Sequence, residues 1–119
     1  MAKSPKLNVD RLEAIYTWAE KNPHEWNQGS WAWKSSCGTT MCAAGTAVVQ
    51  AGYKLLFSPF GAGADSCKKP RGKEWYIPDL AEKLLGLTYD ERYKLFFETG
   101  TSLEELREAI DLIKDGVYR

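Results

Sequence analysis

Three cysteines and one histidine are the side chains of this 119-residue sequence best suited to chemistry. Cys37 precedes a predicted apolar helix and Cys42 lies in its first turn, where backbone N–H groups and the helix dipole favour a thiolate. Such a nucleophile needs a general base within reach, normally a histidine. His24 precedes both cysteines, which is the reverse of the order in papain-like cysteine peptidases. We therefore expect no catalytic residue and a small buried Cys42. A thiol-dependent enzyme that uses Cys42 or Cys37 with His24 is the alternative.

The same residues could also hold a metal. Together with Cys67 they make a Cys₃His set, which is the ligand count of a structural zinc site. Paired zinc ligands are usually separated by about two residues, whereas Cys37 and Cys42 are further apart. His24 and Cys67 are isolated in the sequence. We expect neither metal nor another cofactor, and a small zinc-stabilised module is the alternative.

A short basic run lies in the middle of the sequence. Its cations are Lys68, Lys69, Arg71 and Lys73, and Trp75 and Tyr76 follow closely. Cations beside aromatic rings can contact a nucleic-acid backbone and stack on its bases. Because the whole chain has no net charge, the main interpretation is a solvated loop. A nucleic-acid-binding module is the alternative.

Aromatic residues make up 13% of the chain and include five tryptophans. Large aromatic side chains dominate both domain cores and protein–protein contacts. A domain of this size is not expected to bury all five tryptophans, and an exposed group of them forms a contact patch. The tryptophans that we expect to bind a partner are Trp26, Trp31, Trp33 and Trp75.

Hydrophobic periodicity predicts several helices. Apolar residues at helical spacing predict a first helix over residues 9–22, with Asn8 or Asp10 as its cap. Residues 41–51 carry no charge, so we expect a helix there that is apolar on all sides and lies at the centre of the domain. Thr40 is the expected N-cap of this helix.

The last third of the sequence is also predicted to be helical. Residues 78–85 form a helix with Gly86 as its stop, and a final helix begins at Ser102. Between them, the Thr88-x-x-Glu91 capping box opens a helix with four aromatic residues on one face. These residues are Tyr89, Tyr93, Phe96 and Phe97.

The middle of the chain has a less regular pattern. Residues 53–57 and 73–77 have strand-like compositions, and the Gly- and Pro-containing segment 58–72 between them is predicted as a long loop or an irregular hairpin. Residues 1–7 are predicted to be a flexible N-terminus. We expect one domain over residues 1–119, mostly α, as a compact bundle of four to five helices around the buried apolar helix. A small irregular or β-hairpin insertion completes it.

Charge and composition exclude several classes of protein. The hydrophobic content of 44% and the charged content of 27% are typical of a globular domain, and no membrane span or signal peptide is predicted. The odd number of cysteines indicates a reducing cytoplasm. The charge is uneven, because residues 53–77 carry five basic and two acidic side chains. Residues 78–119 carry six basic and ten acidic ones.

Three segments together resemble a known group of proteins. They are Asn22–Gln28, the Cys-Gly-Thr-x-x-Cys-x-Ala-Gly motif at residues 37–45, and Leu84–Thr88. This order is similar to that in a family of small actinobacteriophage and actinobacterial proteins. Members of the family often have His or Trp where this chain has Thr46, which argues against a metal or catalytic role of the motif. The resemblance implies a phage-type accessory protein in the cytoplasm of a bacterial host.

The expected function is therefore a non-enzymatic one. The chain has no complete catalytic set, but it has many aromatic residues and an acidic C-terminal third, which suit a protein that binds a host protein. The thiol enzyme, the zinc-stabilised module and the nucleic-acid-binding module remain as alternatives. The sequence leaves the oligomeric state open.

Overall fold

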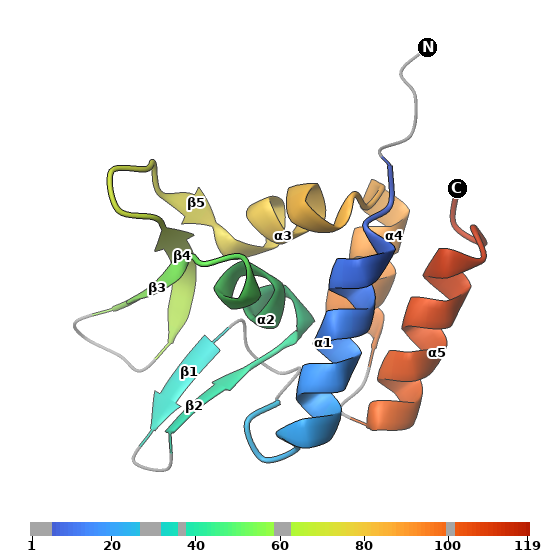
Figure 1. Ribbon diagram of the computed structural model, residues 1–119, viewed down its shortest axis with the longest axis horizontal. Coiled ribbons are helices and arrows are strands. Elements are labelled where there is room, and N and C mark those ends of the chain that lie inside the picture. Colours follow the sequence, from blue (N-terminus) through green and yellow to red (C-terminus); the bar gives the residue numbers. More distant parts are fainter. Residues whose placement is uncertain (1–5, 27–31, 36–37, 59–62, 100–101) are drawn as a thin grey trace.

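The computed structural model describes residues 6–26, 32–35, 38–58, 63–99 and 102–119 (Figure 1). Its described elements are mainly helices, with two small antiparallel sheets, and the predicted mostly helical fold is confirmed. In chain order the elements are α1 (Val9–Lys21), β1 (Ala32–Ser35), β2 (Gly38–Met41), α2 (Ala43–Gln50), β3 (Lys54–Phe57), β4 (Ala64–Lys68), β5 (Trp75–Tyr76), α3 (Ile77–Leu85), α4 (Tyr89–Tyr93), the π-helical segment η1 (Lys94–Glu98) and α5 (Leu103–Lys114).

The helix α1 forms where the sequence predicts its first helix. The Asn8 side chain accepts a hydrogen bond of 3.1 Å from the Arg11 N–H and thereby caps the helix. Leu12, Ile15 and Ala19 recur at helical spacing and are buried. Through its contacts with α2, α3 and α5, α1 joins the central helix to the last helix of the chain.

The central helix begins later than predicted. Met41 is the last residue of β2 and Cys42 is the N-cap, so Thr40 does not cap the helix and α2 starts at Ala43. The reason is that β1 and β2 pair as an antiparallel hairpin, within a stretch that the sequence indicated as an irregular connection and a helix start. The prediction of a buried apolar helix is confirmed, because every residue from Ala43 to Val48 is buried.

A second sheet has the strand order β3-β4-β5, with all neighbours antiparallel. The predicted loop 58–72 therefore contains a strand, β4, while residues 59–62 lie outside the described residues. Cys67 of β4 stands opposite Leu55 and Trp75, and this row belongs to the core or packs against it. Because side chains alternate along a strand, the residues next to this row on each strand lie on the opposite side, which we call the outer sheet face. Its members are Lys54, Leu56, Ser66, Lys68 and Tyr76.

The turn after α3 meets the N-terminal segment. Gly86 ends α3 with a φ of 69°, the left-handed conformation that favours glycine. A Cβ atom at this position would lie 1.9 Å from the carbonyl oxygen of Lys6, so a larger residue does not fit. Leu7 packs against the core, and the flexibility predicted for residues 1–7 therefore does not extend to it. Residues 1–5 lie outside the described part of the chain.

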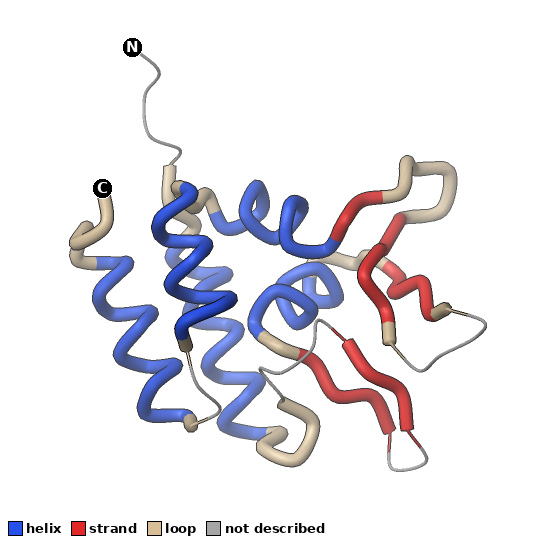
Figure 2. The backbone as a smooth tube through the Cα atoms, turned by 180° about the vertical axis from the view of Figure 1, so that it is seen from behind, coloured by secondary structure: helices blue, strands red, loops and turns tan. Residues whose placement is uncertain are grey.

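The elements divide into two sides around α2 and α3 (Figures 1 and 2). The strands β1–β5 lie on one side and form what we call the strand half. The helices α1, α4 and α5, together with η1, lie on the other side and form the helical half. Among the described residues, no helix is both long enough and apolar enough to cross a membrane.

Candidate functional site

The structure places Cys42 where a reactive thiolate is not favoured. Its side chain has no solvent exposure, although Cys42 occupies the N-cap position of α2. Burial raises the pKa of Cys42 to about 11, and hydrogen bonds from nearby backbone N–H groups lower it by less. Burial also raises the pKa of Cys67, which lies inside the sheet. Both thiols are therefore protonated at neutral pH, in agreement with the expected small buried Cys42.

The other residues of the alternative thiol and metal sites are not assembled in the described structure. His24 is exposed in the turn that follows α1, and Cys37 lies outside the described residues. Within the described ranges, no group of three or more His, Cys, Asp or Glu side chains could hold a metal ion. The Cys₃His zinc site was only the alternative, and the described residues give it no support.

The predicted tryptophan patch is corrected at Trp26. This residue is buried, because its backbone bridges to Met41 and brings the indole into the core. Trp75 is only partly buried, and it packs against the core. Trp31 and the side chain of Trp33 lie outside the described residues.

Three exposed aromatic residues lie elsewhere, on α4 and the following η1. Tyr89, Tyr93 and Phe97 expose 70%, 48% and 53% of their surface, and we call them the aromatic stripe. The rings of Tyr93 and Phe97 are tilted by 31° with their centres 5.6 Å apart. These residues and Arg92 line a surface hollow of about 150 Å³. The sequence places the three rings on one helix face, but it gives no indication that this face is open to solvent.

The π-helical geometry of η1 separates two neighbouring rings. The Thr99 N–H donates to the carbonyl oxygen of Lys94, five residues earlier, at 3.1 Å. In this wider turn Phe96 is buried and Phe97 is exposed. The expectation that Phe96 shares the face of Tyr89, Tyr93 and Phe97 is therefore wrong. Single π turns are often found at functional sites.

A second candidate site is formed by six cations, which we call the cation patch. It unites the four cations of the predicted basic run with one from β3 and one from α3. Its members are Lys54, Lys68, Lys69, Arg71, Lys73 and Lys83. The Lys73 Nζ lies 3.9 Å from the ring centre of Trp75, and Lys83 Nζ lies 5.2 Å from the same centre. The Lys69 Nζ lies 5.0 Å from the ring centre of Tyr53. Such cation–π contacts position the ammonium groups beside the rings.

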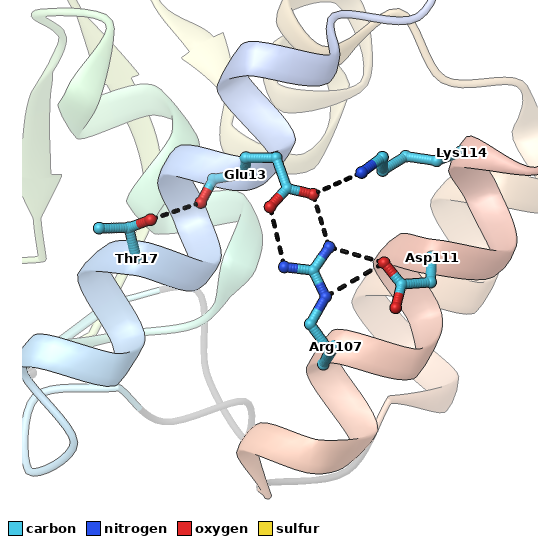
Figure 3. A network of polar contacts seen from close by, with 5 residues as sticks. All are labelled: Glu13, Thr17, Arg107, Asp111 and Lys114. Carbon is cyan, nitrogen blue, oxygen red and sulfur yellow. Dashed lines mark hydrogen bonds and ion pairs between the residues drawn. The ribbon is translucent and has the colours of Figure 1, made fainter.

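Several cations of the helical half have carboxylate partners instead. Figure 3 shows Glu13 of α1 accepting hydrogen bonds from two nitrogens of Arg107 and from Lys114, both on α5. Arg107 also donates to Asp111, and its guanidinium lies 4.7 Å from the ring centre of Tyr16. The hydrogen bonds from Arg107 lower the pKa of Glu13 to about 2. This network joins α1 to α5.

Glu91 is another paired carboxylate of the helical half and, unlike Glu13, it is completely buried. Glu91 completes the capping box of α4, since its side chain accepts a hydrogen bond of 2.9 Å from the Thr88 N–H. Two nitrogens of Arg119 donate to the same carboxylate at 2.9 and 2.7 Å. Burial alone would raise the pKa of Glu91, but the Arg119 and Thr88 hydrogen bonds outweigh it and the pKa is lowered. Arg119 also donates to the carbonyl oxygen of Gly86 at 2.7 Å.

Comparisons with protein-family models, with curated proteins and with solved structures found no match. The aromatic stripe and the cation patch therefore rest on the geometry and chemistry of this chain alone.

Proposed function

We propose that this protein is a non-enzymatic accessory protein that binds another protein through the aromatic stripe. The observation that carries the proposal is the exposure of three large rings, Tyr89, Tyr93 and Phe97, side by side on α4 and η1. Removing such a surface from water on binding is favourable. Tyr and Arg are also among the residues that contribute most to interfaces, and Arg92 lines the same hollow.

The state of the cysteines supports a non-enzymatic role. A thiol nucleophile requires a thiolate, whereas burial keeps Cys42 protonated at neutral pH. His24 is exposed on the turn that follows α1. The chemistry of a thiol enzyme is therefore less well supported than binding.

The shape of the stripe favours an amphipathic helix as the partner element. Its three rings follow one another at intervals of four residues along the rod that α4 and η1 form. A partner helix laid along this rod can pack apolar residues at i, i+3, i+4 and i+7 against the rings.

The charges around the stripe favour basic residues beside the apolar face of that helix. Arg92 is already paired with Asp79 at 2.7 Å, and Lys94 is paired with Glu98 at 3.9 Å. Asp90 is exposed on the same short helix. Residues 78–119 carry ten acidic and six basic side chains, so the surroundings of the stripe attract a cationic partner. The resemblance to phage-type accessory proteins supports a host protein in the bacterial cytoplasm as that partner.

Photo-crosslinking from the stripe tests the proposal. Tyr93 is replaced by the photoreactive residue p-benzoylphenylalanine, and the full chain is irradiated in a bacterial host lysate. A matched protein carries the same residue in place of Tyr76, an exposed tyrosine outside the stripe. We expect position 93, and not position 76, to crosslink to an amphipathic helix flanked by Lys or Arg, as identified by mass spectrometry.

A synthetic peptide of the crosslinked helix then gives the quantitative test. Its affinity should fall about tenfold or more for Tyr93→Ala and for Phe97→Ala, and should not change for Tyr76→Ala. Far-UV circular dichroism of each variant confirms that the fold is retained. Equal crosslinking at both positions, a crosslinked segment without such a helix, or equal affinities of all variants would each refute the proposal.

A further inference from the structure

We infer that the strand half binds single-stranded nucleic acid, with phosphates on the cation patch and bases on the outer sheet face. This inference goes beyond the protein-binding role, because it concerns a different surface and a different class of partner. The patch surrounds a three-stranded sheet whose outer face carries an exposed tyrosine. Flat sheets with cations and aromatic rings are a common architecture for holding single strands.

The cations of the patch have no carboxylate partner among the described residues. In the described part of the chain, none of the six forms an ion pair with a carboxylate. Every cation from Arg92 onward does form one. Residues 53–77 carry only two carboxylates, Asp65 and Glu74, both exposed. The patch therefore has a net positive charge that an external anion can neutralise.

Two of the cations stand directly opposite each other in the sheet. Lys54 of β3 and Lys68 of β4 are partners in the antiparallel register, so their side chains share the outer sheet face. Like charges in this position destabilise a sheet. An anionic backbone that lies across the pair removes this repulsion, which gives a specific place for a phosphate.

The turn between β4 and β5 keeps an arginine in a conformation that favours glycine. Arg71 has a φ of 65°, and the Gly72 N–H donates to the Lys69 carbonyl oxygen at 2.9 Å. With Pro70 before Arg71, this is the geometry of a type II turn, which prefers glycine or asparagine at the Arg71 position. The fold thus keeps a guanidinium at the tip of the turn despite backbone strain, and a phosphate is a natural partner for such a group.

An aromatic ring lies next to these cations on the same face. Tyr76 is 46% exposed and stands opposite Ser66, two residues from Lys68 along β4. A base can stack on an exposed tyrosine while the neighbouring lysines contact phosphates. The outer sheet face has few aliphatic side chains, with only Leu56 among its members, so it is poorly suited to insertion into a membrane.

Fluorescence anisotropy with a labelled oligo-dT strand of about 15 nucleotides tests the inference. Neutralising about six phosphates predicts that the logarithm of the association constant falls with the logarithm of salt concentration with a slope of about −4. Titrations between about 50 and 200 mM salt measure this slope. We expect a duplex of the same sequence to bind more weakly, because its bases cannot reach Tyr76.

Three substitutions distinguish the effect of a lost phosphate contact, the effect of a lost stacking contact and the effect of a charge removed elsewhere. Arg71→Asn should weaken binding several-fold and reduce the slope by about 0.7, while the unfolding midpoint stays the same or rises because Asn suits the turn. Tyr76→Ala should weaken binding without changing the slope. Lys114→Gln removes the same charge from the helical half and should leave binding unchanged, so it is the matched control.

Several results would overturn the inference. The first is no binding to the oligonucleotide at the lowest salt concentration. The second is an equal loss of affinity in Lys114→Gln and Arg71→Asn, which would show that overall charge, and not the patch, attracts the strand. The third is that heparin or anionic lipid vesicles bind as tightly as the oligonucleotide and that Tyr76→Ala has no effect. Salt-sensitive self-association without oligonucleotide binding would instead assign the patch to a second copy of the chain.

Discussion

The strand half and the helical half differ in the partners of their best-defined cations. In the helical half, Arg107 and Arg119 are each fixed by two hydrogen bonds to a carboxylate of an earlier helix, Glu13 of α1 and Glu91 of α4. In the strand half, Lys69 and Lys73 contact only aromatic rings among the described interactions, and Arg71 projects from a strained turn. The first arrangement stabilises the fold, and the second leaves charge available to a partner.

The partners of a charged side chain therefore indicate its role better than its position in the molecule does. The whole chain has no net charge. Loss of a carboxylate-bound arginine of the helical half should therefore lower the free energy of unfolding. Loss of a cation of the strand half should hardly change it. Three substitutions, ordered from the largest expected effect to the smallest, test this contrast.

The largest effect is expected for Arg119→Ala. Glu91 has no solvent exposure, so removal of Arg119 leaves a buried carboxylate without its charged partner. Breaking such a pair from one side costs about 3 kcal/mol or more. Chemical denaturation at neutral pH measures the loss, with Arg71→Asn as a matched control that should change stability little. If Arg119→Ala and the wild type were equally stable, the cations of the helical half would not stabilise the fold more than those of the strand half.

A smaller, pH-dependent effect is expected for Arg107→Ala. The Glu13 network is partly exposed, so its loss should cost about 1 kcal/mol at neutral pH. The pKa of Glu13 is about 2 in the folded protein and near its ordinary value of 4.5 in the unfolded chain. The network therefore stabilises fully above pH 4.5 and loses its contribution as the pH falls through 2.

Denaturation curves of the wild type and of Arg107→Ala on both sides of pH 4.5 test this second prediction. The difference in the free energy of unfolding should be largest at neutral pH and should narrow as the pH falls. A difference that stays constant over this range would mean that Arg107 acts through its packing on Tyr16 and not through Glu13.

The smallest effect, with the opposite sign, is expected for Lys54→Gln. This substitution removes the repulsion with Lys68 across β3 and β4 and should stabilise the protein by about 0.3 kcal/mol. Because salt screens exposed charges, the gain should decrease as salt is added. Thermal denaturation at low and at high salt measures it. A clear loss of stability would show that Lys54 contributes to the fold.

Local sequence rules account for the helices. Periodicity and capping residues correctly indicate α1, α3 and α5, and the capping box at Thr88 and Glu91 is present as predicted. These features depend on residues close together in the chain, which is why they can be predicted. The hairpin of β1 and β2 could not, because its strands are short and pair within a stretch that resembles a loop followed by a helix.

The sequence could predict only part of each candidate site. The basic run was visible because Lys68, Lys69, Arg71 and Lys73 are neighbours in the chain. Lys54 joins them only through the strand register, and Lys83 only through the packing of α3 beside Trp75. Exposure of the aromatic stripe depends on which face of α4 and η1 meets the core, and periodicity alone does not give this orientation.

The buried Glu91 links two segments that are separate in the chain. If α4 docked while α5 was still detached, the Glu91 carboxylate would lose its contact with water without gaining the Arg119 guanidinium. A buried carboxylate without a charged partner is strongly unfavourable at neutral pH. Residues 88–99 and 103–119 should therefore open and close as one cooperative unit, with similar hydrogen-exchange protection. The aromatic stripe lies on this unit, so a protein bound to it would also slow the exchange of amides in α5.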